Sequence, residues 1–298
     1  METKTGGNPQ DIRQGAKHTL FVEGTENSFD VKVIQKLLDK NELGQIRVET
    51  MGGCDNVRSA AQALIQHHPD YYFLIDRDDQ SDETVTKSWG KFPNPAEYNM
   101  IIWRKRELEN YFIDPEYLKY SSYIKSGSTI ADIKEYILKK CNERLFFDAA
   151  NLTILSLNRQ LQQRPLNTFR NPDEFISQQD GLSQLVQLGS IEKKLTAIAN
   201  LLQQNNIEQI YENFINELSS GQTPLQYNCG NWLFRMTGKE IFHSMATQYF
   251  QVISNTGILQ GAQQREQIAL QLVKLPLAQQ PDDFQELVNL LRQRLASS

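Results

Sequence analysis

The chain has few cysteines, and it lacks the spacing that would make them metal ligands. Cys54, Cys141 and Cys229 are scattered, odd in number and never in a Cys-x-x-Cys pattern. Such usage is typical of a reducing compartment and predicts no zinc site. The histidines also lack metal-ligand spacing, so we interpret them as structural or surface residues.

Long apolar runs are absent as well. Nowhere do about 18 apolar residues follow one another, the minimum for a membrane span. The opening residues 1–7 contain no apolar core of the kind that signal peptides carry. A net charge of −5 argues against a polycation that coats nucleic acid. It does not argue against a nuclease, because local basic patches and bound metal offset phosphate repulsion. We expect a cytoplasmic protein with no membrane contact.

Apolar and polar segments alternate with strand and helix periods over residues 18–113. The predicted strands are 19–23, 45–50, 71–76 and 99–104, the predicted helices are 29–38 and 55–67, and a polar loop fills 79–98. This alternation predicts an α/β fold: a Rossmann-like, mainly parallel sheet with right-handed crossovers.

The composition changes after Asp114-Pro115, where the chain becomes rich in Gln, Asn and Leu at helical spacing. A short amphipathic helix is predicted at the end of the chain, from about Asp282 to Leu295. We therefore expect a mobile tail over 1–17, a catalytic core over 18–113, a helical insertion over 114–222 and a C-terminal part over 223–298.

Carboxylates stand where two predicted strands end. Glu23-Gly24 closes the apolar stretch 18–22, and Asp76-Arg77-Asp78 closes 71–75. The carboxyl ends of parallel strands form the ligand crevice of an open α/β sheet. Acidic oxygens gathered there suit Mg²⁺ or Mn²⁺. Each cluster also has a plainer interpretation. The first could be a helix cap and first-turn acid that stabilise the following helix, and the second could be the start of a solvated acidic loop.

A third cluster follows the fourth predicted strand and reaches the same edge of the sheet. Here Glu107 and Glu109 could complete a second metal position, while Arg104 and Arg106 could meet phosphates. The alternative is a charged connector in which Glu pairs with Arg.

A fourth candidate is Thr237-Gly238-Lys239. A Gly-Lys at a helix start offers a cation and free N–H groups to a phosphate. An ordinary turn before a surface helix is the alternative. The full P-loop pattern is missing, so nucleotide triphosphate binding is not indicated.

Taken together, the motifs occur in one order along the chain. They are Phe21-Val-Glu-Gly24, Gly52-Gly53, Ile75-Asp-Arg-Asp78, Arg106-Glu-Leu-Glu-Asn-Tyr111 and Gly238-Lys239. In this combination the chain resembles a TOPRIM domain, the catalytic fold of topoisomerases, primases and OLD-family nucleases. The last two motifs resemble those of the OLD-like, ABC-ATPase-associated branch, which includes the AriB-like effectors of the PARIS anti-phage system.

The resemblance implies roles for individual residues. Glu23, Asp76 and Asp78 would ligate Mg²⁺ (or Mn²⁺), Glu109, alone or with Glu107, would add a second-metal ligand, and Lys239 would stabilise charge on the phosphate. One position departs from the family pattern, which has Asp where this chain has Asn27, just after Glu26. An amide oxygen can still ligate a metal, but it adds no negative charge.

The resemblance also implies a metal-dependent nuclease that serves as a toxin-like effector of anti-phage defence. It would cleave host tRNA, be controlled by an ABC-type ATPase and act as a homodimer. An OLD-like DNA nuclease is one alternative, because nothing in these residues decides between RNA and DNA. A TOPRIM module that binds nucleic acid or a partner without cutting is another.

Overall fold

The computed structural model describes residues 18–162, 182, 189–255 and 257–296. Its contacts divide the chain into two compact units, one formed by Met1–Cys141 with Leu233–Ser298 and the other by Asn142–Trp232. The tail predicted over residues 1–17 lies outside the described residues.

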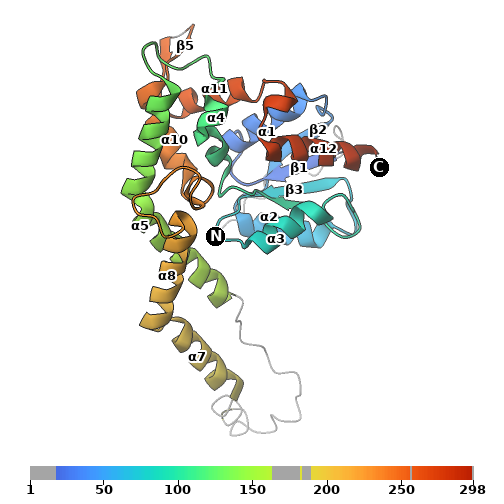
Figure 1. The fold of residues 1–298 in the computed structure, drawn as a ribbon. Helices are drawn as coiled ribbons and strands as arrows, with labels where there is room; N and C mark the ends of the chain where they lie inside the picture. Colours follow the sequence, from blue (N-terminus) through green and yellow to red (C-terminus); the bar gives the residue numbers. More distant parts are fainter. Residues whose placement is uncertain (1–17, 163–181, 183–188, 256, 297–298) are drawn as a thin grey trace. The chain divides into compact units, whose positions relative to one another are not determined.

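The first unit is built on a four-stranded parallel sheet of order β2-β1-β3-β4. Helices α1 and α12 lie over one face of this sheet, and α2 and α3 lie over the other (Figure 1). Because both faces are covered, β1 is buried at every position, which explains its continuous apolar sequence. The elements are β1 (His18–Val22), α1 (Phe29–Lys40), β2 (Ile46–Thr50), α2 (Cys54–Leu64), β3 (Tyr71–Ile75), α3 (Asp82–Lys91) and β4 (Met100–Ile102).

These elements confirm the predicted α/β class and the parallel sheet, and each predicted strand and helix of this region is present. The prediction of a polar loop over residues 79–98 is wrong, because α3 occupies the middle of this segment. Ser81 caps this helix by accepting a hydrogen bond of 3.2 Å from the Thr84 N–H. Its apolar face consists chiefly of Val85 and Trp89, both buried. Two apolar side chains among polar neighbours are too few to show a helical period in the sequence.

The segments after β4 complete the same core. They include η1, a 3-10 helix in which all residues are buried. The Phe112 ring of η1 lies 5.8 Å from the rings of Phe29 in α1 and Phe242 in α10, and 6.2 Å from Phe284 in α12. The C-terminal segment therefore shares one core with the sheet. The elements are η1 (Leu108–Ile113), α4 (Pro115–Leu118), α9 (Trp232–Arg235), α10 (Gly238–Tyr249), β5 (Val252–Ser254), β6 (Gly257–Leu259), α11 (Gly261–Leu272), η3 (Leu277–Gln279) and α12 (Asp282–Ala296).

The described part of the second unit is mainly helical. It takes in the C-terminal part of α5 (Ile130–Gln162), α7 (Gly189–Leu201) and α8 (Gln204–Ser219). Residues 114–141, which we placed in the helical insertion, lie in the unit that holds the sheet.

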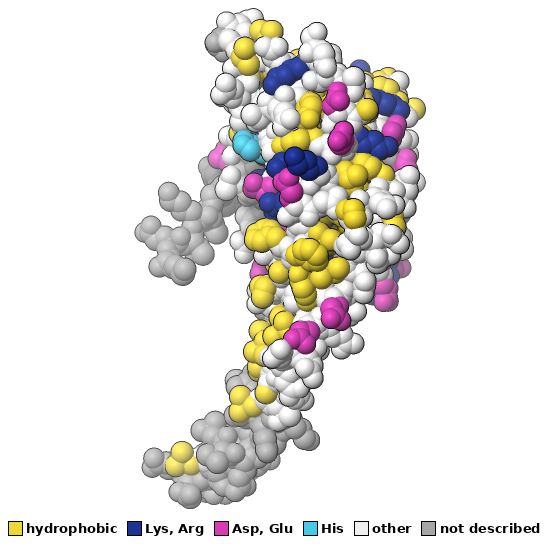
Figure 2. Space-filling model, turned by 60° about the vertical axis from the view of Figure 1, so that its left-hand side comes forward, with side chains coloured by type: hydrophobic (Ala, Val, Ile, Leu, Met, Phe, Trp, Pro, Cys, Tyr) yellow, Lys and Arg dark blue, Asp and Glu magenta, His cyan; other side chains and the backbone are white. Residues whose placement is uncertain are grey.

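Large apolar side chains are exposed on α5 of the second unit. Phe146 and Phe147 are 58% and 59% exposed and Ile154 is 55% exposed. Figure 2 shows yellow side chains gathered over this part of the chain. Even so, none of the described helices combines the length and apolarity that a membrane crossing needs.

Candidate active site

The ends of β1 and β3 bring the first two acidic clusters together. The two strands pair in parallel through Val22 and Leu74, so the residues that follow them leave the same edge of the sheet. There the backbone N–H of Asp76 donates a hydrogen bond of 2.9 Å to Oε1 of Glu23. The carboxylate of Glu23 is thereby fixed against the start of the Asp76–Asp78 turn.

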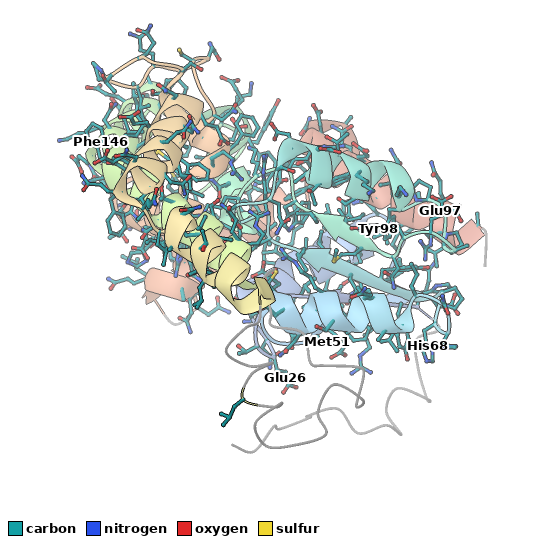
Figure 3. The ribbon with its side chains drawn as sticks, turned by 90° about the horizontal axis from the view of Figure 1, so that it is seen from below. Glu26, Met51, His68, Glu97, Tyr98 and Phe146 are labelled. Atoms are coloured by element: carbon teal, nitrogen blue, oxygen red, sulfur yellow. The ribbon has the colours of Figure 1, made fainter. Side chains whose placement is uncertain are left out.

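Gly24 gives the turn after β1 its shape. Its φ is +114°, and its N–H donates to the Gly52 carbonyl at 3.0 Å, which ties this turn to the start of α2. A Cβ at Gly24 would lie 2.9 Å from Oγ of Ser28, so a side chain there would be both strained and crowded. Glu26 and Met51 lie at the N-terminal end of α2, and His68 lies at the opposite end (Figure 3).

Two buried arginines hold the Asp76–Asp78 turn in place. Arg77 is 7% exposed, and its guanidinium donates to the carbonyls of Arg104 at 2.8 Å and Gln80 at 3.2 Å. Arg235 is 3% exposed and donates to the Asp78 carbonyl at 2.9 Å. Asp78 itself has a left-handed φ of 49°. We did not single out either arginine from the sequence, where no local pattern distinguishes a buried arginine from a surface one.

The third and fourth motifs meet at the N-terminus of α10. Oε1 of Glu107 accepts hydrogen bonds from the Thr237 hydroxyl at 3.0 Å and the Lys239 N–H at 2.7 Å. Nδ2 of Asn110 donates to the Met236 carbonyl at 2.9 Å. The motifs are therefore held together by direct hydrogen bonds, and one Glu107 oxygen is already used twice.

Gly238 permits this approach. A Cβ at this position would lie 2.6 Å from the backbone N of Asn110 and 2.8 Å from its side chain. Only a residue without a side chain fits between the two motifs, which accounts for the glycine of the Gly-Lys pair.

Four acids, three of them predicted from the sequence, act electrostatically on Asp76. Burial raises the pKa of Asp76 well above its usual range, and the negative charges of Asp30, Glu23, Glu107 and Glu109 raise it further.

The neighbouring glutamates behave in the same way. Burial raises the pKa of Glu23 to about 7, and the charge of Asp78 adds to the rise. The pKa of Glu109 is also raised to about 7, by burial first and then by Asp30 and Glu107. Crowded carboxylates of this kind hold protons unless a cation offsets their repulsion.

Asp30 is a member of this cluster that the sequence analysis missed. It lies in the first turn of α1, and burial raises its pKa to about 6 while the positive charge of Lys239 opposes the rise. Asn27, which stands where the family pattern has Asp, is exposed and has a left-handed φ of 61°. Asp30 stands at the start of a predicted helix, a few residues after the Glu-Gly turn. That position is the signal that could have identified it from the sequence.

The predicted cations are placed differently from one another. Lys239 is exposed, and its charge counteracts the raised pKa values of Asp30 and Glu109. Arg106 lies near Asp78. Burial raises the pKa of Asp78, and the positive charge of Arg106 offsets part of that rise.

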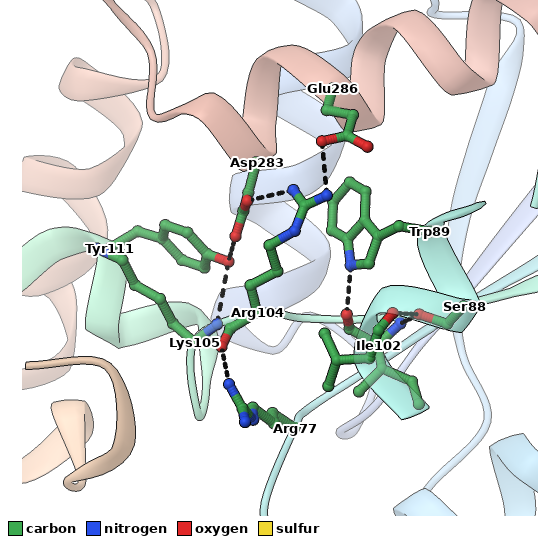
Figure 4. Close-up of polar contacts among 10 residues, drawn as sticks. Arg77, Ser88, Trp89, Ile102, Arg104, Lys105, Tyr111, Asp283 and Glu286 are labelled. Carbon is green, nitrogen blue, oxygen red and sulfur yellow. Dashed lines mark hydrogen bonds and ion pairs between the residues drawn. The ribbon is translucent and has the colours of Figure 1, made fainter. Parts of the chain in front are cut away.

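Arg104, in contrast, is engaged by α12 (Figure 4). Its guanidinium forms ion pairs with Asp283 at 2.6 Å and Glu286 at 2.7 Å, and it lies 4.1 Å from the centre of the Trp89 ring. These contacts give it a role in joining α12 to the sheet.

The chemistry of this cluster fits a hard divalent cation. Its side chains are carboxylates, the ligands that Mg²⁺ and Mn²⁺ prefer, and no histidine is among them. In the arrangement that the described residues adopt, no three Asp, Glu, His or Cys side chains are close enough to hold a metal ion.

No protein-family model matches the chain, and neither does any curated protein or solved structure.

Proposed function

We propose that this chain is a metal-dependent nuclease with a TOPRIM catalytic core. The observation that carries the proposal is the gathering of Glu23, Asp30, Asp76, Asp78 and Glu109 at the carboxyl edge of a parallel sheet. The four-stranded parallel sheet is compatible with the TOPRIM fold that the sequence motifs resemble.

The carboxylates would hold the metal. Glu23, Asp76 and Asp78 form the first ligand set, with Mg²⁺ or Mn²⁺ as the ion, and Asp30 and Glu109 offer a second position beside Lys239. When bound, such an ion polarises the scissile phosphate and lowers the pKa of a water molecule.

The other residues act on the phosphate and on the geometry of the site. Lys239 would neutralise the charge that develops on the phosphate during cleavage, and Arg106 would contact the substrate backbone. Glu107 holds the Lys239 backbone through its 2.7 Å hydrogen bond, and we assign it a positioning role. Arg77 and Arg235 keep the Asp76–Asp78 turn in one conformation.

The biological role is proposed from the motif resemblance alone. On that ground the nuclease is an effector of anti-phage defence that cleaves host tRNA, is controlled by an ABC-type ATPase and acts as a homodimer. A DNA substrate, as for OLD-like nucleases, is the alternative that the first experiment separates.

That experiment is the incubation of total tRNA and supercoiled plasmid with the purified chain, in Mg²⁺, in Mn²⁺ and in EDTA. The double variant Asp76→Asn with Asp78→Asn should abolish cleavage and still fold. Glu83→Gln, an exposed acid at the start of α3, is the matched control and should cleave normally.

Retained cleavage in the double variant would refute the proposal. Plasmid nicking would move the substrate to DNA. Silence on both substrates calls for the same assay with the companion ATPase, and silence there too would leave a binding module.

A further inference from the structure

Arg58 is a cation at the acidic cluster that no sequence motif contains. It lies on α2 one turn after Cys54, whose thiol interacts with the Glu23 carboxylate and lowers its pKa. This turn of α2 therefore lies against Glu23. Burial raises the pKa of Glu23 and of Asp78, and the positive charge of Arg58 opposes this rise in both.

The guanidinium of Arg58 is half-buried and is not engaged by the fold. In the part of the chain that the structure describes, it forms no hydrogen bond and no ion pair. The arginines nearby behave differently, because Arg77 and Arg235 bind backbone carbonyls and Arg104 is paired with α12. Arg58 thus keeps its donors available at the edge of the site.

Arg106 supplies a second guanidinium on the Asp78 side. Its backbone is fixed, since its N–H donates to the Phe234 carbonyl at 2.7 Å and its carbonyl accepts from the Arg77 N–H at 2.9 Å. Its side-chain Nη1, however, is buried without a hydrogen-bond partner. Buried polar atoms are nearly always paired, so this nitrogen needs an acceptor oxygen that the described residues do not supply.

We propose that Arg58 and Arg106 bind one phosphate of the substrate on the Asp78 side of the acids, next to the phosphate that is cleaved. This inference rests on the proposed nuclease function and adds the path of the strand. Lys239 acts on other members of the cluster, Asp30 and Glu109, so we infer that the strand runs along the acids between the N-terminus of α10 and α2. The planar guanidinium presents paired N–H donors that match phosphate oxygens.

A structural role for Arg58 would be that of a counter-charge for Glu23 and Asp78, and the two roles predict different effects. Loss of a counter-charge alone would change metal affinity. The affinity for nucleic acid and its salt dependence would stay unchanged. Loss of a phosphate contact would in addition weaken nucleic-acid binding and reduce its salt dependence.

The test is the binding of a fluorescent 20-nucleotide RNA and of the same sequence as single-stranded DNA, measured by anisotropy in Ca²⁺ over a range of salt concentrations. Arg58→Ala should weaken binding about tenfold or more and reduce the slope of log K against log salt by about one. Arg58→Lys should restore only part of the affinity. Lys87→Ala, an exposed cation on α3, is the control and should bind normally.

A second arm locates the contact. Oligonucleotides with a single uncharged methylphosphonate are scanned along the strand, and the penalty of Arg58→Ala should disappear at one position. Wild-type affinity and salt slope in Arg58→Ala would overturn the inference, as would a penalty that persists at every methylphosphonate or a wild-type chain that binds neither strand.

Failure of the nuclease proposal has a different signature. If the wild type binds the strand and never cleaves it, while Arg58→Ala weakens binding, the phosphate site stands and the nuclease does not. If the wild type cleaves with metal and Arg58→Ala binds and cleaves equally well, the nuclease stands and the phosphate site does not.

Discussion

The backbone N–H of Lys239 donates a hydrogen bond of 2.7 Å to the carboxylate of Glu107, across a separation of 132 residues. This bond sets the N-terminus of α10 against the turn that precedes η1. It places Lys239 beside the acids at the end of the sheet, where its charge acts on Asp30 and Glu109. The relationship also distinguishes Glu107, which positions a neighbour, from Glu109, which is buried in the cluster.

The role of Glu107 can be tested by comparing two substitutions. Glu107→Gln keeps an oxygen that accepts the hydrogen bonds from Thr237 and Lys239, so we expect it to retain most of the nuclease activity. Glu107→Ala removes both bonds and should lose activity and about 1–3 kcal/mol of stability. Cleavage rates and urea unfolding of both variants are the measurements. If the Gln variant is as inactive as the Ala variant while remaining folded, Glu107 is a metal ligand instead.

Substitution of Gly238 should separate the two motifs. Gly238→Ala places a methyl group 2.6 Å from the backbone N of Asn110, and we expect it to cost about 1–3 kcal/mol of stability and to reduce cleavage. The matched control is Gly90→Ala in α3, where a Cβ meets no atom within 4 Å. There the same change should be neutral or stabilising by about 0.5–1 kcal/mol. Equal stability of the two variants in thermal unfolding would contradict the crowded approach at Gly238.

Asp30 and Asn27 offer a test of which residue belongs to the acidic cluster. Asp30→Asn removes a charge that acts on Asp76 and Glu109, so we expect weaker Mn²⁺ binding and cleavage at least about tenfold slower. Asn27→Ala changes an exposed side chain and should leave both unchanged. Isothermal titration with Mn²⁺ and the cleavage assay distinguish them. The opposite ranking would return the metal-ligand role to position 27.

Metal binding should stabilise the fold more strongly as the pH rises. Burial raises the folded-state pKa of both Glu23 and Glu109 from 4.5 to about 7. For an acid whose pKa is raised on folding, the contribution to stability is complete below the unfolded pKa and is lost as the pH rises through the folded one. The metal-free chain should therefore lose stability between about pH 4.5 and pH 7 from these two groups.

A bound divalent cation favours the charged carboxylates and competes with their protons. The difference in Tm between Mg²⁺ and EDTA should be small at pH 5.5 and large at pH 8. Glu23→Gln with Glu109→Gln should remove most of this pH dependence. A difference in Tm that is the same at both pH values would show that these acids do not bind the ion.

The sequence alone determined the sheet and the position of the first acids. A buried parallel strand needs an apolar run, and the residue after each run must leave the sheet at its carboxyl edge. For this reason Glu23 and Asp76 were predicted to be neighbours, and the 2.9 Å hydrogen bond between them places them so. The α3 helix was not predicted because Val85 and Trp89 are the only large apolar side chains on its buried face, which it shares with Ser88.

Only the tertiary structure decided which charged residues reach the acids. Arg104 and Arg106 are two residues apart in one motif, yet α12 engages Arg104 while Arg106 faces Asp78. Arg58 and Asp30 belong to no motif that we identified, and each lies at the cluster because α2 and α1 begin beside the strand ends. Such placements depend on contacts between segments distant in the sequence, and a local pattern of charge and hydropathy contains no information about the partner that a long side chain will meet.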